Sequence, residues 1–344
     1  MAEDRIWSEY ARKRRVFILG AGFSAAAGIP MTATLLATAM KTFAAECPGI
    51  HQRVCNYAND IQWEKEGEPD FSLISFSDLC THLEFVELRE YAGGERWSDA
   101  GSREKLALRY YLAKTIVRMT PTADDIPDLY IQFAKQLTSD DIVITFNWDI
   151  LLELAIMKVG KTFTYNFERD HVKLSKLHGS VNWRLGKATR QGKPIDTLNW
   201  QPIGFANGGM IEIDLYSSVQ LSSILTWDRY QPLGELQPFL VLPGYGKAFD
   251  VRSISTLWYR PEFTFAACRD IYIVGLGLSP DDHFIRSFFL NNFPMEERKT
   301  FVINPDVHAH NNYAFMLKDQ NVEFIAEKFS IAHVKLILDR LQTE

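Results

Sequence analysis

The chain has 344 residues, of which 47% are hydrophobic and 23% are charged, and its formal net charge at pH 7 is -6. This composition is ordinary for a folded protein, and the length suffices for two domains. The acidic balance disfavours a protein whose whole surface binds nucleic acid, so direct nucleic-acid binding is not indicated. No apolar run reaches the length of a membrane span and the charged first residues lack a signal-peptide core, so we expect a cytoplasmic protein without membrane contact.

Residues 15–30 read RVFILGAGFSAAAGIP, an apolar run that ends in a glycine turn. Val16 to Leu19 carry no polar break, which predicts a strand buried on both faces in a parallel sheet. Gly20, Gly22 and Ala25 then form the Gly-x-Gly-x-x-Ala pattern of dinucleotide-binding turns. In that pattern the first glycine permits the tight turn, the second lets backbone N–H groups approach a pyrophosphate, and the positive end of the following helix faces the anion. The same turn can also join a strand to a helix without binding anything.

The remaining chain alternates between strand-like and helix-like segments. The first strand and its helix extend to about 45, and residues 50–138 carry apolar side chains at helical spacing, which predicts a helical insertion. Strands are predicted at 141–145 and 172–176, with a helix closing at Gly160 between them. Residues 184–236 are rich in turns and predict a small β-rich module. A strand, a glycine loop and a helix recur at 270–290, followed by a strand at 300–304 and a closing helix.

This alternation predicts an α/β fold with a Rossmann-like parallel sheet, a helical insertion and a small β-rich module. The corresponding domains are the first part of the core at 1–49, the insertion at 50–139, the continued core at 140–183, the β-rich module at 184–236 and the completed core at 237–344.

Polar clusters stand where the predicted strands end. They lie at 20–24, 145–149, 176–180 and 275–279, and Asn304 makes a fifth. Ligands of doubly wound sheets bind beyond the carboxyl ends of the strands, so these clusters predict one pocket. Each cluster alone has a structural explanation, because Asp149 can cap the next helix and His178 can be an ordinary loop histidine. Together they predict an amide, a carboxylate and an imidazole beside a phosphate cradle.

The order of these clusters and their amino-acid sequences resemble those of the sirtuin family. GAGFSAAAGIP resembles the family's glycine loop, TFNWD its Thr-x-Asn-x-Asp segment, and LHGS the loop with its active-site histidine. GLGLS and VIN resemble its two later NAD-contacting segments. The resemblance covers 15–46, 141–183 and 237–306, and it implies an enzyme that cleaves the bond between nicotinamide and ribose in NAD.

The resemblance also implies roles for single residues. Asn147 would position the water or the ribose hydroxyls, Asp149 would hold the carboxamide, and His178 would act as general base. Nicotinamide leaves NAD as a neutral molecule, so no strong general acid is needed, and an imidazole that titrates near neutral pH suits the removal of a proton. The residues implied in NAD binding are Gly20, Ala21, Gly22, Ser24, Gly275, Gly277 and Asn304.

Departures from the family point away from protein deacylation. Deacylating members carry two cysteine pairs for zinc after the His-Gly-Ser loop, whereas Cys268 is the next cysteine after His178 and stands alone. No Cys-x-x-Cys pair occurs anywhere in the chain, so we expect no zinc. The family's Asp-Phe-Arg is replaced at 31–33, and LPGYGK (242–247) stands where deacylases pair with their peptide. Water is then the expected acceptor, and nicotinamide and ADP-ribose the products.

Among divergent sirtuins, the sequence resembles the bacterial NAD-depleting effectors of anti-phage defence. Such effectors are held silent until triggered, because uncontrolled loss of NAD kills the cell. The resemblance therefore implies control by homo-oligomeric assembly or by a regulatory partner protein, for which a ring-forming ATPase is one candidate.

Other functions stay open on the sequence. A sirtuin-type deacylase or ADP-ribosyltransferase shares the first chemical step and differs in the acceptor. A non-catalytic module that senses NAD or ADP-ribose needs the glycine loops but not the acid–base residues. An NAD-dependent dehydrogenase is disfavoured, because the acidic Glu46 ends a helix-like segment where that fold needs the end of a second strand.

Overall fold

The computed structural model describes most of the predicted core and parts of the inserted segments. The described residues are 15–62, 67–89, 102–165, 169–185, 200–206, 209–214, 238–245, 247, 257–258, 268–278, 282–292, 299–317 and 321–342. By its internal contacts the chain forms two compact units. Unit 1 comprises 1–29, 121–177 and 255–344, and unit 2 comprises 30–120 and 178–254.

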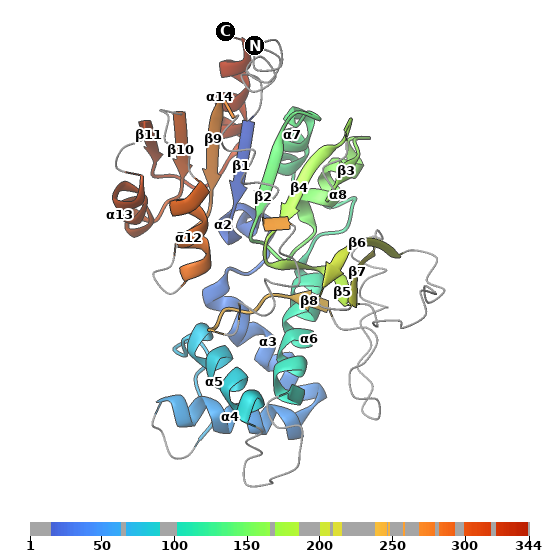
Figure 1. The fold of residues 1–344 in the computed structure, drawn as a ribbon, viewed down its shortest axis with the longest axis vertical. Coiled ribbons are helices and arrows are strands. Elements are labelled where there is room, and N and C mark those ends of the chain that lie inside the picture. The colour runs from blue at the N-terminus through green and yellow to red at the C-terminus, as the bar shows by residue number, and fades with distance from the viewer. Residues whose placement is uncertain are drawn as a thin grey trace. The chain divides into compact units, whose positions relative to one another are not determined.

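Unit 1 is built on a seven-stranded sheet with the order β11-β10-β9-β1-β2-β4-β3, in which all paired strands are parallel (Figure 1). The order runs outward from β1 in both directions, so the carboxyl ends of β1 and β9 flank a topological switch point. This arrangement confirms the predicted α/β class with a Rossmann-like parallel sheet. The strands are β1 (Arg15–Leu19), β2 (Ile142–Thr145), β3 (Phe163–Thr164), β4 (Val172–Lys176), β9 (Asp270–Val274), β10 (Lys299–Ile303) and β11 (Asn321–Ile325).

The central strands are buried along their whole length, as their apolar sequences require. Every residue of β1, β2 and β9 is buried. Across three strands, the rings of Phe17, Tyr272 and Phe301 stack in a row with centroids 5.2 and 5.1 Å apart. Phe133 packs edge-on against Phe17 from the covering helix α7 (Asp128–Gln136). Aromatic burial of this kind is a large part of the apolar stabilisation of the sheet.

Among the described residues of unit 1, further helical segments accompany the sheet. α2 (Ala21–Ser24) has four residues and continues into a 3-10 turn, η1 (Ala25–Ala27), which ends at Gly28 with φ of 81°. The predicted single helix after the glycine turn is therefore wrong, because the left-handed Gly28 stops it after about two turns. The other helices are α8 (Leu151–Lys158), α12 (His283–Asn292), α13 (Val307–Met316) and α14 (Ile331–Gln342).

Unit 2 combines helices with an antiparallel sheet. Its helices are α3 (Thr32–Glu46), α4 (Pro48–Gln62), α5 (Phe76–Arg89) and α6 (Ser102–Met119). Its four strands have the order β6-β7-β5-β8, with β5 (Gly179–Leu185), β6 (Trp200–Ala206), β7 (Gly209–Asp214) and β8 (Pro238–Leu240). The insertion and the β-rich module thus form one unit, in which α6 packs against β5 and β8. Much of the predicted 184–236 module lies outside the described residues.

The bounds of the units differ from the predicted domain bounds for reasons of packing. α3 packs against α4 and α6, so unit 2 begins at Pro30 and not at residue 50. α7 packs against α8 and α14, so residues from 121 belong to unit 1 although the prediction placed them in the insertion. β5 already begins at Gly179, where the prediction extended the core to 183.

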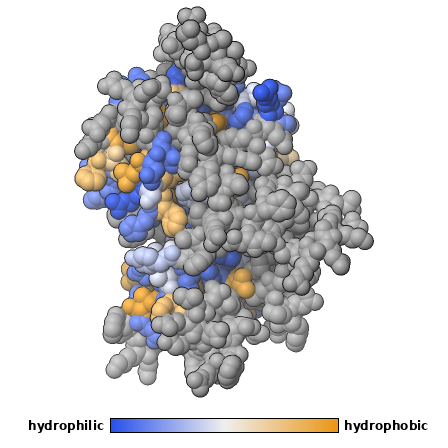
Figure 2. All heavy atoms as spheres, in the orientation of Figure 1, coloured by the Kyte–Doolittle hydropathy of each residue, from blue (hydrophilic) through white to orange (hydrophobic). Residues whose placement is uncertain are grey.

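The surface of the described part carries several exposed apolar side chains. Among them are Leu290 of α12 and Val307 and Phe315 of α13. Figure 2 shows apolar residues gathered over these two helices. Among the residues that the structure describes, no helix has the length and apolar character that crossing a membrane requires.

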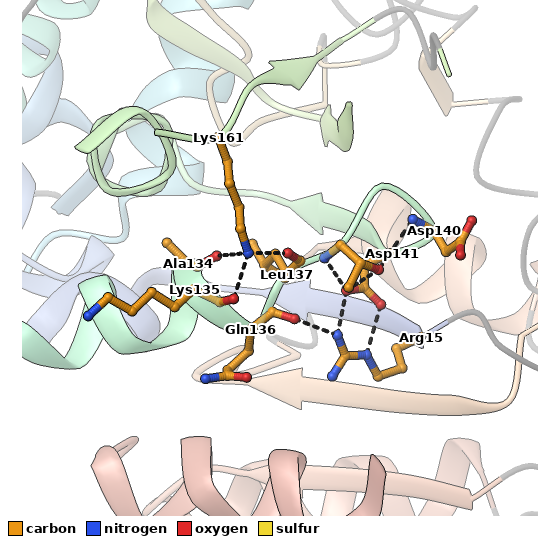
Figure 3. A network of polar contacts seen from close by, with 9 residues as sticks. Arg15, Ala134, Lys135, Gln136, Leu137, Asp140, Asp141 and Lys161 are labelled. Atoms are coloured by element: carbon orange, nitrogen blue, oxygen red, sulfur yellow. Dashed lines mark hydrogen bonds and ion pairs between the residues drawn. The ribbon is translucent and has the colours of Figure 1, made fainter. Parts of the chain in front are cut away.

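The amino ends of β1 and β2 are tied together by a buried ion pair. The Arg15 guanidinium donates to both carboxylate oxygens of Asp141, at 2.8 and 2.5 Å, and also to the carbonyl of Gln136 (Figure 3). Beside it, the Lys161 ammonium donates to the carbonyls of Ala134, Lys135 and Leu137 at the end of α7. These contacts fix the end of the sheet opposite the predicted site.

Candidate functional site

The glycine turn after β1 packs directly on the loop after β9. The Gly20 N–H donates to Val274 O at 3.0 Å, and the Gly22 N–H donates to Gly275 O at 2.9 Å. A Cβ placed on Gly20 would lie 2.5 Å from the Leu276 Cα, and one on Gly22 would lie 2.8 Å from the Gly275 Cα. Two backbones approach here more closely than any side chain allows. Both glycines are therefore required by the packing of the two loops.

This packing explains why glycine is needed at positions 20 and 22 in a different way from the prediction. The predicted reason for Gly22 is the approach of N–H groups to a pyrophosphate, yet the N–H groups of Gly20, Gly22 and Phe23 all donate to protein carbonyls. The short α2 also offers a smaller dipole to an anion than the predicted helix, because the dipole sums over aligned peptide units. Phosphate and ribose binding by residues 20–24 stays a prediction.

Asn147 is joined to the glycine turn through its side chain. Its Nδ2 donates to Gly20 O at 2.9 Å and to Ser24 Oγ at 3.1 Å, while its backbone N–H donates to Thr145 Oγ1 at 3.0 Å. The strand register places it there, because Leu19 pairs with Thr145 and both strands end at the same edge of the sheet. The structure thus brings together two of the clusters that the sequence predicts to meet.

Asp149 lies beside this contact and faces the interior. Its carboxylate accepts a hydrogen bond from the Leu151 N–H at 3.1 Å, at the first residue of α8, and interacts with the Ser24 hydroxyl. A cavity of about 10 Å³ adjoins it, which is room for about one water molecule. Its lining residues are Leu19, Phe23, Ser24, Thr145, Asn147, Asp149, Leu152, Glu153 and Lys176.

Burial raises the pKa of Asp149. The Lys176 ammonium and the Ser24 hydroxyl act against this effect, and the Glu153 carboxylate adds to it. Raised pKa values of buried carboxyls are frequent at functional sites, since such sites hold charge away from water.

Two charged residues of this site had no predicted role, although Lys176 lies in the predicted cluster at 176–180. Lys176 and Glu153 form an ion pair at 2.8 Å, with side chains that are 1% and 5% exposed. The Lys176 ammonium also donates to the backbone carbonyl of Asp149, and the Tyr165 hydroxyl donates to Glu153 at 2.9 Å. One signal was available in the sequence, because Asp149 and Glu153 are four residues apart in the predicted helix, a spacing that puts two side chains on one face. In the structure Asp149 lies before α8, which begins at Leu151.

The loops after β9 and β10 complete the edge of unit 1. The Asn304 side chain donates to Leu276 O at 3.0 Å and accepts from the Asp306 N–H at 3.0 Å. Gly275 has φ of 63°, and its N–H donates to Ile303 O. By contrast, a Cβ at Gly277 would meet no atom of the described residues within 4 Å. Of the two glycines that the resemblance implies in NAD binding within this loop, Gly277 therefore has room beside it and Gly275 does not.

His178 begins unit 2, directly after Leu177. Unit 1 holds Leu177 through two contacts, since its N–H donates to Thr145 O at 2.9 Å and its carbonyl accepts from the Trp258 indole at 3.1 Å. Within unit 2 the carbonyl of His178 accepts from the Val241 N–H at 2.9 Å. Gly179 has φ of 76°, and a Cβ there would lie 2.2 Å from the Phe239 carbonyl, so β5 can start only with glycine.

The described residues contain no group of three or more His, Cys, Asp or Glu side chains placed to hold a metal ion. All four cysteines are free thiols, and burial raises the pKa of Cys55 to about 11. That shift makes the Cys55 thiolate scarce at neutral pH, so the thiol is unreactive. The expected absence of zinc stays a prediction.

Comparison with known proteins finds similar structures but no similar sequences. No protein-family model and no curated protein matches the chain. A solved structure of Sir2 bound to an acetylated peptide has 12% sequence identity and a TM-score of 0.44, and the alignment covers 100% of both chains. A Sir2 homologue in complex with NAD has 12% identity and a TM-score of 0.42, with 99% of this chain and 94% of that chain covered. These values describe a distant similarity only. The assignment of the fold class rests on the strand order of the sheet.

Proposed function

We propose that this chain hydrolyses NAD at the bond between nicotinamide and ribose. Water adds to the ribose carbon as that bond breaks, giving nicotinamide, ADP-ribose and one proton. The observation that carries the proposal is the double hydrogen bond from Asn147 to Gly20 O and Ser24 Oγ. It joins the glycine turn, which borders the switch point between β1 and β9, to the polar end of β2 on its other side. Doubly wound folds bind nucleotides in the crevice at such a switch point.

The hydrogen bonds of Asn147 define what it would offer the substrate. Both hydrogens of its amide are directed at protein oxygens, so Oδ1 is the atom that would accept a hydrogen bond from water or a ribose hydroxyl. Asp149 would hold the carboxamide, as the sequence resemblance implies. His178 would take the proton from the attacking water, since an imidazole can act as a base near neutral pH.

The wider role is proposed on the sequence resemblance alone. We place the chain among cytoplasmic, zinc-free effectors of anti-phage defence that deplete NAD. Its activity would be held in check by homo-oligomeric assembly or by a regulatory partner protein, with a ring-forming ATPase as one candidate.

The test is to incubate the purified chain with NAD at several protein concentrations and to measure nicotinamide and ADP-ribose by chromatography. We expect equimolar release of both products. His178→Ala should slow the release by about 100-fold or more, the typical contribution of a general base. His308→Ala, which changes an exposed histidine of α13, serves as the matched control and should leave the rate unchanged.

Each contrary result has a defined meaning. Release that persists in His178→Ala would remove the histidine from the mechanism. Binding of NAD without release at any protein concentration would contradict hydrolysis by this chain alone and would favour a module that senses NAD.

A further inference from the structure

The buried ion pair between Lys176 and Glu153 has no part in the proposed reaction. Burying two charges costs several kcal/mol per ion in proteins, and apolar side chains of similar size often stabilise a fold as well or better. A pair with side chains only 1% and 5% exposed is therefore weakly explained by stability. Its position beside Asp149 offers another explanation.

The contacts of the pair lead directly to Asp149. The Lys176 ammonium donates to the backbone carbonyl of Asp149 and, at 2.8 Å, to Glu153 Oε1. The same Glu153 oxygen accepts from the Tyr165 hydroxyl at 2.9 Å. Lys176 is the last residue of β4, and Glu153 lies in the first turn of α8. The ion pair therefore joins the start of α8 to the carboxyl end of β4.

Among the residues that the structure describes, charged and titratable groups face the Asp149 carboxyl from three elements. Lys176 faces it from β4, Glu153 from α8, and Tyr130 from α7, where the Tyr130 hydroxyl donates to Phe23 O at 2.8 Å. Ser24 adds an uncharged hydroxyl from α2. Lys176 is thus the cation in this set, and Glu153 is the second carboxylate.

We propose that Lys176 is a positioning residue that favours the carboxylate form of Asp149 beside Ser24 and Asn147, and that Glu153, its ion-pair partner, limits this effect. The consequence for the site rests on the proposed function, because it assumes that Asp149 serves NAD cleavage. The electrostatic part does not depend on the reaction. Opposite charges within about 4–6 Å favour ionisation of a carboxyl, and like charges oppose it.

Two substitutions should therefore act in opposite directions. Lys176→Met removes the cation at nearly constant size, so the pKa of Asp149 should rise by about one unit or more. Glu153→Gln removes the like charge and leaves Lys176 in place, so the pKa of Asp149 should fall. Mere structural damage would not produce shifts of opposite sign.

The experiment follows the carboxyl carbon of Asp149 by NMR in the full chain labelled with ¹³C-aspartate, over a pH titration. Asp149→Asn assigns the signal. Lys173→Met is the matched control. Lys173 lies near the amino end of β4, away from Lys176, and its ammonium donates to the Ser139 carbonyl. The rate of NAD cleavage is measured over the same pH range, and its acid limb should move with the carboxyl signal.

Opposite shifts in Lys176→Met and Glu153→Gln, with none in Lys173→Met, would support the proposal. Shifts in the same direction, or none, would overturn it. If Lys176→Met does not fold, the downward shift in Glu153→Gln decides alone. A carboxyl that shifts as expected in a chain that never cleaves NAD would leave the positioning intact and refute the proposed function.

Discussion

Two glycines in the loop after β9 have opposite surroundings. Gly275 has φ of 63°, and a Cβ on it would lie 2.3 Å from the Phe23 nitrogen. A Cβ on Gly277 would meet no atom of the described residues within 4 Å. We predict that Gly275→Ala lowers the free energy of unfolding by about 2–4 kcal/mol, from backbone strain and overpacking together. Gly277→Ala should change it by less than about 1 kcal/mol. Urea denaturation followed by circular dichroism measures both.

The same pair of variants separates packing from ligand binding. If NAD occupies the space beside Gly277, then Gly277→Ala should weaken NAD binding in a titration while stability stays unchanged. If the two variants lose equal stability, then steric conflict at Gly275 is not the cause of the loss.

At this scale the sequence predicts which side chains gather but not how they bond. Gly20 and Asn147 follow two apolar strands, so their approach could be predicted from the edge that parallel strands share. The bonds from Asn147 to Gly20 O and Ser24 depend on the register of β1 and β2, which no local pattern contains. Lys176 lies in the predicted cluster at 176–180, but its ion pair was not predicted, because Glu153 becomes its neighbour only once β4 pairs with β2.

Among the elements, α7 ends in an unusual cap. The Lys161 ammonium donates to three carbonyls at the end of this helix, and burial lowers its pKa. The last carbonyls of a helix lack intrahelical partners, and a cation there also meets the negative end of the dipole. The cap therefore stabilises the element that covers Phe17.

We predict that Lys161→Met lowers the free energy of unfolding by about 1–3 kcal/mol, because it leaves partly buried carbonyls without a donor. Lys135→Met, which removes an exposed ammonium from α7 itself, is the control and should cost less than about 0.5 kcal/mol. Thermal unfolding of the two variants compares them. If Lys161→Met loses no more stability than the control, water hydrogen-bonds to the carbonyls in place of the Lys161 ammonium.

Element types were largely predictable, and element lengths were not. The periodicity of 151–158 and 331–342 is local and was recognised, as helices α8 and α14 show. The length of the helix after the glycine turn was overestimated, because small residues at 25–27 suit a helix and only the left-handed Gly28 ends it. Composition does not reveal which φ a glycine adopts.

For the molecule as a whole, the α/β class followed from the alternation of strands and helices, but the division into units did not. The assignment of α3 to unit 2 depends on contacts with α6, whose sequence lies more than 50 residues away. The grouping of the helical insertion with the antiparallel sheet depends likewise on α6. Such contacts join distant segments, and hydrophobic periodicity describes only near ones.

Acid stability is a property of both units, because each contains histidines with shifted pKa values. Burial lowers the pKa of His51 and His82 in unit 2 and of His333 in unit 1 below the ordinary value of 6.5. The folded chain therefore takes up these protons less readily than the unfolded chain. The stability that the neutral rings provide is complete above about pH 6.5 and is lost as the pH falls from there toward their folded-state pKa values.

His333 provides the sharpest test of this linkage. Its Nδ1 accepts a hydrogen bond from the Ser330 N–H at 3.1 Å, at the start of α14, and a protonated ring has no lone pair for that bond. We predict that the chain is less stable to urea at pH 5.5 than at pH 7.5, and that His333→Gln reduces this difference, since a glutamine oxygen accepts at either pH. His308→Gln, at an exposed position, should retain the full difference. The raised pKa of Asp149 acts with the opposite sign, but it is common to all three proteins and cancels in the comparison. If His333→Gln loses as much stability between pH 7.5 and pH 5.5 as the unmodified chain, then other groups cause the loss.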